Sequence, residues 1–389
     1  MNNASPVPDP APSASHTLAN GARITLDPRP HAASVAVVLH LVGGTREEDA
    51  ASAGHLHLLE HLLLRRSARC DAPSLARRIA ALGGMINAET DREHLVLIGR
   101  APAAQAPALA ELLVECLCEP GFDETDLALE QGVIDAERTF VGQMPVDEAL
   151  LRLAWPEHPL GCPVLPVKPT PASPAALRML WARQAAGTRL RVAIAGGFDP
   201  LAMHAALDRL SALPTGTGPT WGAAPLFVPG RYGQMREDRP ATLMWALPCP
   251  DCRIGDMPAW ELTATALQQA LTRALRESGL AYACAVWPQV YSDAGLILVR
   301  VAAPPGRVVA CADRVEQQFD ALAAGGLSPD ECALAHQTLA ARRALAADDL
   351  ESCARDAAAA QRPLRTPPAT SGYAAVPTAR ATLRVVVSA

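Results

Sequence analysis

The stretch His57-Leu-Leu-Glu60-His61 lies in an otherwise largely apolar segment that runs from Gly54 to Leu64. In a helix, His57 and His61 project from one face on consecutive turns, where two imidazoles can share one metal ion. Glu60 flanks this face, in the position of a general base rather than a ligand. His55 faces elsewhere and is expected to be a bystander. The pattern therefore predicts a catalytic zinc site on a helix; the alternative is an amphipathic helix whose histidines border a partly wet core.

A catalytic zinc ion takes three protein ligands and keeps one position open, so another element must supply a His, Asp, Glu or Cys. Residues 122–140 predict a helix with Asp123 as its N-cap and acidic residues in its first turn. Glu130 and Glu137 lie seven residues apart on one face of this helix. Two alternatives stay open: a solvated acidic face, or a structural zinc site closed by a fourth ligand such as Cys70.

These motifs resemble those of the pitrilysin/insulinase family of zinc metallopeptidases (the inverzincins), to which the mitochondrial processing peptidases also belong. In that family a glutamate further along the chain completes the H-x-x-E-H site, with a helper glutamate two turns before it. Glu137 and Glu130 match these two positions. The resemblance covers most of the chain, and further similar segments are residues 19–25, 42–48, 82–90 and 158–161. Two departures, Leu64-Arg-Arg-Ser67 after the zinc helix and His94 to Leu97 after the edge strand, leave substrate preference open.

The resemblance implies one Zn²⁺ per chain and a zinc-dependent endopeptidase that cleaves unstructured peptides, such as precursor or leader peptides. The implied zinc ligands are His57, His61 and Glu137, with Glu60 as general base and Glu130 behind the ligands. The strand around Asn87 and Ala88 is expected to bind the peptide backbone along an exposed edge. The rival function is a non-catalytic assembly subunit, which the complete ligand set disfavours.

Arg276 and Tyr282 resemble a pair that binds the substrate backbone in active family members. The spacing here is six residues instead of the usual seven. An ordinary helix end with Gly279 as its C-cap explains the segment about as well. Family members of this length form half of a clamshell, so we expect a homodimer or a heterodimer with a family paralogue.

The fold class is expected to be α+β, with two similar domains of mainly antiparallel sheet packed with helices. The predicted boundaries are a disordered tail at 1–15, a zinc-binding domain at 16–212, a Pro/Gly-rich linker at 213–234 and a metal-free domain at 235–389. Residues 122–130 parallel residues 327–335, which indicates duplication. In that alignment Ala335 replaces Glu130 and Arg342 replaces Glu137, so only the first half is expected to hold metal.

Composition limits the partners and the cellular location that we expect for this protein. The 389 residues carry a net charge of −6 with no basic cluster, which argues against nucleic acid or an anionic membrane surface as a partner. No apolar run reaches the roughly 18 residues of a membrane helix. The start has no signal-peptide pattern, and abundant alanine with Lys168 as the only lysine is typical of GC-rich bacterial genes. We therefore expect a bacterial cytoplasmic enzyme.

The ten cysteines are scattered and show no disulfide framework. Those in predicted apolar elements, such as Cys116, Cys118, Cys284 and Cys332, are expected to act as small hydrophobes. Cys249 and Cys252 form a lone C-x-x-C, which is weak evidence of redox chemistry.

Overall fold

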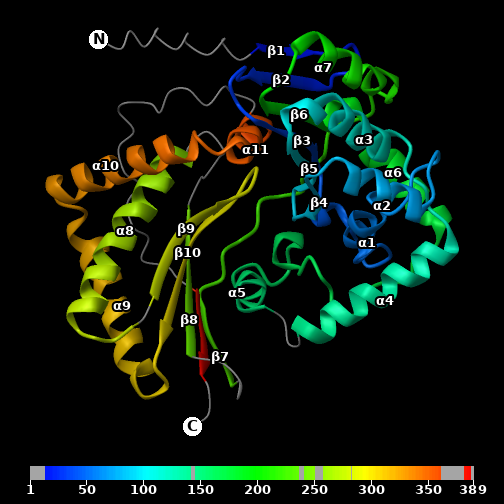
Figure 1. Ribbon diagram of the computed structural model, residues 1–389. Coiled ribbons are helices and arrows are strands. Elements are labelled where there is room, and N and C mark those ends of the chain that lie inside the picture. The colour runs from blue at the N-terminus through cyan, green and yellow to red at the C-terminus, as the bar shows by residue number, and fades with distance from the viewer. Residues whose placement is uncertain are drawn as a thin grey trace, which may run out of the picture. The chain divides into compact units, whose positions relative to one another are not determined.

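The computed structural model describes residues 14–141, 145–235, 241–249, 257–281, 283–360 and 381–386. The chain divides into two compact units. The first contains Met1–Phe140, Val164–Thr220 and Ala346–Leu364, and the second contains Val141–Pro163, Trp221–Leu345 and Arg365–Ala389. Each unit is built around a mainly antiparallel sheet packed with helices (Figure 1). The predicted α+β class is therefore confirmed.

The sheet of the first unit has six strands in the order β1-β2-β6-β3-β5-β4. Only β2 and β6 run parallel. The central strand β3 is buried on both faces, which explains its continuous run of apolar residues. β4 pairs with β5 alone and lies at one edge. The strands are β1 (Ala14–Thr17), β2 (Arg23–Pro28), β3 (Ser34–Val42), β4 (Met85–Thr90), β5 (His94–Pro102) and β6 (Leu190–Gly196).

Helices cover both faces of this sheet. Most of them pack on one face in the main core, where Leu39 of β3, Leu59 of α1 and Leu113 of α3 are fully buried. α11 covers the other face through Leu350 and Ala354. The helices of the unit are α1 (His55–Leu63), α2 (Ala72–Ala81), α3 (Ala106–Cys118), α4 (Glu124–Val141), α6 (Pro174–Gln184), α7 (Pro200–Leu207) and α11 (Leu350–Ala360).

The second unit repeats this topology. Its strand order, β7-β11-β8-β10-β9, corresponds to β2-β6-β3-β5-β4, and again only the first pair is parallel. Its core is built around Trp245 and Phe319. The elements are α5 (Val146–Ala154), β7 (Gly230–Met235), β8 (Ala241–Pro248), α8 (Met257–Glu277), β9 (Ala283–Val290), β10 (Gly295–Ala303), α9 (Val308–Gly325), α10 (Pro329–Ala346) and β11 (Ala381–Val386). The shared topology supports the duplication seen in the sequence.

Two segments belong to different units from those expected from their place in the chain. Residues 141–163, predicted in the first domain, lie in the second unit, where α5 packs Leu150 and Leu151 against β8 and β10. Residues 346–364, predicted in the second domain, lie in the first unit with α11. An amphipathic helix shows in its sequence that one face is buried, but not which sheet buries it.

Two edge strands were also not expected. β1 begins at Ala14, inside the predicted disordered tail, and Ser15 shares a 3.0 Å hydrogen bond with Thr25 of β2. β7 begins inside the predicted linker and pairs with β11, far along the chain. Both strands are short; β1 forms a hairpin with the neighbouring β2, whereas β7 depends on a distant partner.

The predicted helix caps are present. The Asp123 carboxylate accepts a hydrogen bond from the Asp126 N–H at 2.9 Å at the start of α4. Ser328 and Glu331 bond reciprocally in a capping box at the start of α10.

Within the described residues no helix is both long and apolar enough to span a bilayer.

Candidate metal centre

The two histidines of the motif are presented by a helix that is anchored in the main core. Leu56, Leu59 and Leu62 of α1 are fully buried, which fixes the rotation of the helix about its axis. His57 and His61 then project together from the remaining face, and their Nε2 atoms lie 3.3 Å apart.

Glu137, on α4, brings a carboxylate to the same point. Its Oε2 atom lies 3.7 Å from the Nε2 atom of His57 and 3.7 Å from that of His61. Tetrahedral zinc has bonds of about 2.0–2.2 Å to histidine nitrogen and carboxylate oxygen, which sets its ligand atoms about 3.3–3.6 Å apart. The three donor atoms therefore form a triangle of the right size for one zinc ion.

The protonation of His57 suits metal binding, which needs neutral imidazole. Burial, helped by the nearby charges of His61 and Arg138, lowers the pKa of His57 to about 4. The Nδ1 atom of His61 lies 3.2 Å from Oε2 of Glu130. A carboxylate at Nδ1 favours the tautomer that leaves the lone pair on Nε2.

Glu130 is itself held by a network that joins α4 to the end of α1. It is buried, and its Oε1 atom lies 3.2 Å from Arg65. Arg65 also contacts Asp126 at 3.2 Å, and Arg66 contacts the same carboxylate at 2.5 Å. The two arginines directly follow α1 and link it to α4, the other helix that carries a candidate ligand.

Glu60 lies beside the donor triangle and is not part of it. Burial raises the pKa of its carboxyl above the ordinary value, while hydrogen bonds from Thr90 lower it in part. Thr90 is the last residue of the edge strand β4. A buried carboxyl group with a raised pKa beside the candidate metal ligands is suited to act as a proton acceptor.

The donor set is open on one side. The side chain of Glu137 is 42% exposed, whereas that of His57 is 9% exposed. Among the described residues, no fourth histidine, cysteine or carboxylate joins the cluster. The side chain of Cys70 is hydrogen-bonded to Arg78 instead, and His55 is buried outside the cluster. An open position favours a catalytic site over the structural alternative.

The expected substrate-binding residues differ in how the structure presents them. Asn87 is exposed on the edge strand, whereas Ala88 is buried in the main core. Arg276 lies at the exposed end of α8, where Leu280 N–H bonds to Leu275 C=O and Gly279 has a φ of +59°. This Schellman ending matches the C-cap explanation. Tyr282 and Cys252 lie outside the described residues.

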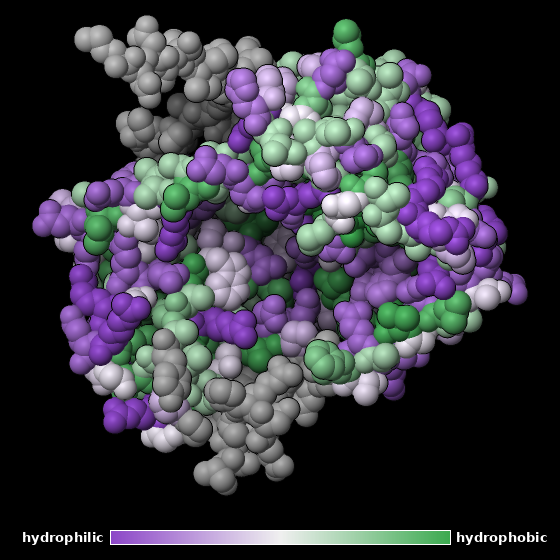
Figure 2. Space-filling model, in the orientation of Figure 1, coloured by the Kyte–Doolittle hydropathy of each residue, from purple (hydrophilic) through white to green (hydrophobic). Residues whose placement is uncertain are grey.

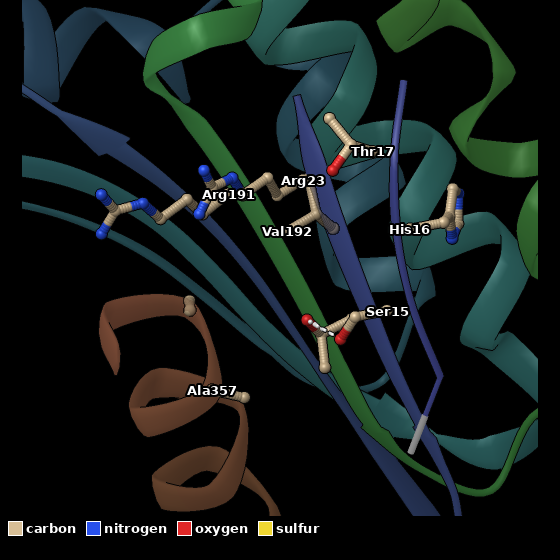
Figure 3. Close-up of a pocket in the computed structure, with 9 residues that line it drawn as sticks. Ser15, His16, Thr17, Arg23, Arg191, Val192 and Ala357 are labelled. Atoms are coloured by element: carbon tan, nitrogen blue, oxygen red, sulfur yellow. Dashed lines mark hydrogen bonds between the residues drawn. The ribbon is translucent and has the colours of Figure 1, made fainter. Parts of the chain in front are cut away.

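A separate cavity of about 220 Å³ lies in the first unit, between the β1 end of the sheet and α11 (Figure 3). Arg23 and Arg191 are neighbours in the parallel β2–β6 pairing and both line it. Burial lowers the pKa of Arg191 to about 10, with Arg23 adding to the effect, and Arg191 donates to the carbonyl of Ala359 at the end of α11. None of the metal-centre residues lines this cavity.

The cysteines fit the structural expectation. Cys116 is fully buried, and Cys118, Cys284 and Cys332 pack against the two main cores. No disulfide joins any of the described cysteines.

Three residues of the centre were not anticipated: Arg65, Arg66 and Thr90. Their roles depend on contacts with α4 and α1 that sequence spacing does not reveal.

Comparisons with known proteins point to one family. Residues 23–167 match the family model described as Insulinase (Peptidase family M16), and residues 173–339 match the Peptidase M16 inactive domain. The division agrees with the cluster of candidate metal ligands in the first unit and with Ala335 and Arg342 at the corresponding positions of α10.

Relatives lie at low identity. An uncharacterized zinc protease of Mycobacterium leprae is 25% identical over 361 residues, covering 86% of this chain and 79% of that protein. The mitochondrial-processing peptidase subunit alpha of Solanum tuberosum is 29% identical over 135 residues, covering 34% of this chain and 27% of that protein. The solved peptidase M16 inactive domain from Pseudomonas fluorescens superposes with a TM-score of 0.81 at 17% identity, covering 97% of this chain and 98% of that chain. This last match supports the fold alone.

Proposed function

Because the chain belongs to the insulinase family of peptidases, family M16, we propose that it is a zinc-dependent endopeptidase that cleaves unstructured peptides. The observation that carries this proposal is the open triangle of donor atoms from His57, His61 and Glu137, with Glu60 beside it. Zinc bound by three such ligands supplies Lewis acidity and a water nucleophile at neutral pH.

The chain's own residues supply the remaining functions. Glu60 accepts the proton of the attacking water and passes it to the leaving amine, for which its raised pKa is suited. Glu130 holds His61 in the metal-binding tautomer. The edge strand β4 ends at Thr90, next to Glu60, so an extended peptide added to this edge would have its backbone close to the base. A segment inside a helix or a sheet cannot add to this edge, because its backbone hydrogen bonds are already made.

The test separates the base from the ligands. Glu60→Gln should keep the zinc content and lower peptide turnover by about 10²–10⁴-fold, because it removes a proton acceptor and no ligand. His57→Ala should lose the zinc itself. Glu111→Gln, an exposed substitution on α3, is the matched control. Equal turnover in Glu60→Gln and wild type, with chemistry rate-limiting, would exclude Glu60 as the base.

The rival function is a non-catalytic assembly subunit. A chain that serves only as a partner has no need of ligands, base and supporting glutamate together, yet all of these lie in one place here. Zinc-loaded protein that cleaves no unstructured peptide, alone or with any paralogue, would favour the rival.

We also propose that the chain acts paired with a second family chain, either its own copy or a paralogue. Leu129, Val133 and Phe140 are exposed along one face of α4 (Figure 2). Leu334 and Leu345 are exposed at the corresponding positions of α10. Exposed apolar residues at helical spacing on both copies of a repeat are typical of an interface.

Light scattering during size-exclusion chromatography tests the pairing. Phe140→Ser should shift the population towards monomer, because this side chain is 87% exposed and its burial would stabilise the pair. High turnover by a strict monomer would contradict the need for a partner.

A further inference from the structure

The zinc helix begins without a cap of its own. Its N-cap residue is Gly54, which has a φ of +86° and offers no side-chain hydrogen bond, and its first turn contains no acidic residue. The first N–H groups of any helix have no partner within the helix, and they carry partial positive charge. α1 therefore needs an acceptor from elsewhere.

Glu48, in the turn after β3, supplies that acceptor. Its Oε2 atom accepts from the Gly54 N–H at 3.0 Å, and its Oε1 atom accepts from the Leu56 N–H at 2.7 Å. One carboxylate thus satisfies two donors at the start of α1, through charge-assisted bonds. The next residue along the helix is His57, so Glu48 holds the turn from which this donor projects.

Glu48 is in turn held by its neighbours in the sequence. Arg46 pairs with Glu93, between β4 and β5, at 2.5 Å. Glu47 pairs with Arg189, just before β6, at 2.5 Å and 3.0 Å. Consecutive charged residues of this turn therefore reach three different parts of the first unit, and the position of the carboxylate is set by the sheet rather than by α1.

Burial of the Glu48 carboxylate is electrostatically unfavourable. Burial raises the pKa of Glu48 to about 7, against the opposing effect of the hydrogen bonds from Leu56, Gly54 and His55. The ionised side chain is therefore less stable here than in water. A carboxyl group that is buried at such a cost is a candidate for a functional role.

We propose that Glu48 is a positioning residue for the metal centre: its carboxylate fixes the first turn of α1 and so aligns His57 with His61 and Glu137. The inference rests on the proposed metal-binding function and adds a residue that touches neither metal nor substrate. Residues that orient ligands from outside the coordination sphere commonly change metal affinity by about 10–100-fold.

The experiment compares Glu48→Ala and Glu48→Gln with Asp49→Asn in the full chain. Asp49 is exposed and its carboxylate accepts from Ala51 and Ser52, so its variant removes a neighbouring charge without removing a side-chain hydrogen bond to α1. Hydrogen exchange of the metal-free proteins is followed over the peptide 54–63. Zinc affinity is measured by competition with a chromophoric chelator, and the Co²⁺ form is examined by visible absorption for the geometry of the site.

Glu48→Ala should raise exchange in 54–63, weaken zinc binding by about tenfold and alter the Co²⁺ spectrum. Glu48→Gln, which retains an acceptor, should recover part of each effect, and Asp49→Asn should match wild type. Unchanged exchange in Glu48→Ala would overturn the inference, as would faster exchange with wild-type zinc affinity and spectrum. Wild-type protein that binds no metal would overturn the proposed function instead, and with it the positioning role, while the exchange data would still decide whether Glu48 holds α1.

Discussion

Glu130→Gln is the sharpest test of how the chain supports its metal centre. In the native protein the carboxylate of Glu130 faces Nδ1 of His61 at 3.2 Å, and the residue is only 7% exposed. The substitution keeps the size of the side chain and retains one oxygen that can accept from Nδ1–H. It removes the negative charge that strengthens this bond and that faces Arg65 at 3.2 Å.

The magnitude follows from the change in bond type. A hydrogen bond that involves a charged group contributes about 1.5–3 kcal/mol, against about 0.5–1.5 kcal/mol for a neutral one. The loss should therefore be about 1–2 kcal/mol. At about 1.4 kcal/mol per factor of ten, this corresponds to zinc binding that is about 5–30-fold weaker.

Zinc affinity is measured at neutral pH by competition with a chromophoric chelator, with thermal unfolding of the metal-free protein recorded in parallel. Glu124→Gln is the control, since Glu124 is exposed on the same helix. Equal affinity in the two variants would refute the role of Glu130. Weaker binding that is matched by loss of the folded state without metal would assign the effect to stability instead.

Three further predictions concern the scaffold. Burial, aided by nearby cationic side chains, lowers the pKa of His40 from 6.5 to about 3. Between these pH values the native state binds fewer protons than the unfolded chain, so stability should fall as the pH drops through this window. His40→Gln should therefore flatten the dependence of the urea midpoint on pH. Gly44→Ala would place a Cβ 2.1 Å from the carbonyl oxygen of Asp91, so it should lower stability by about 3 kcal/mol or more, and a wild-type melting temperature would count against the close approach. Gly132→Ala, in α4 with nothing within 4 Å of the added Cβ, should raise stability by about 0.5–1 kcal/mol, and a loss would contradict the helical, exposed setting.

Local patterns in the sequence determined much of this protein. The spacing of His57 and His61 in an apolar run defines a helix with two imidazoles on one face, because helical geometry depends only on residues close in the chain. The caps Asp123 and Ser328 mark helix starts for the same reason. The absence of the two glutamates from the second half also predicted that the candidate metal ligands lie in the first, since duplication aligns the two long helices residue by residue.

Tertiary structure decided what depends on distant partners. Which sheet receives α5 and which receives α11 is set by the packing of whole units, and the edge strand β7 forms only by pairing with β11, far along the chain. The sequence identifies Glu137 as the third candidate ligand only through a resemblance, whereas its 3.7 Å distances to both histidines arise from the packing of α4 against α1. The hydrogen bonds of Glu48 to the start of α1 likewise come from a turn that is fixed by ion pairs to residues far along the chain, Glu93 and Arg189. Helical periodicity can be recognised along the chain, but contacts between side chains far apart in the sequence depend on tertiary packing.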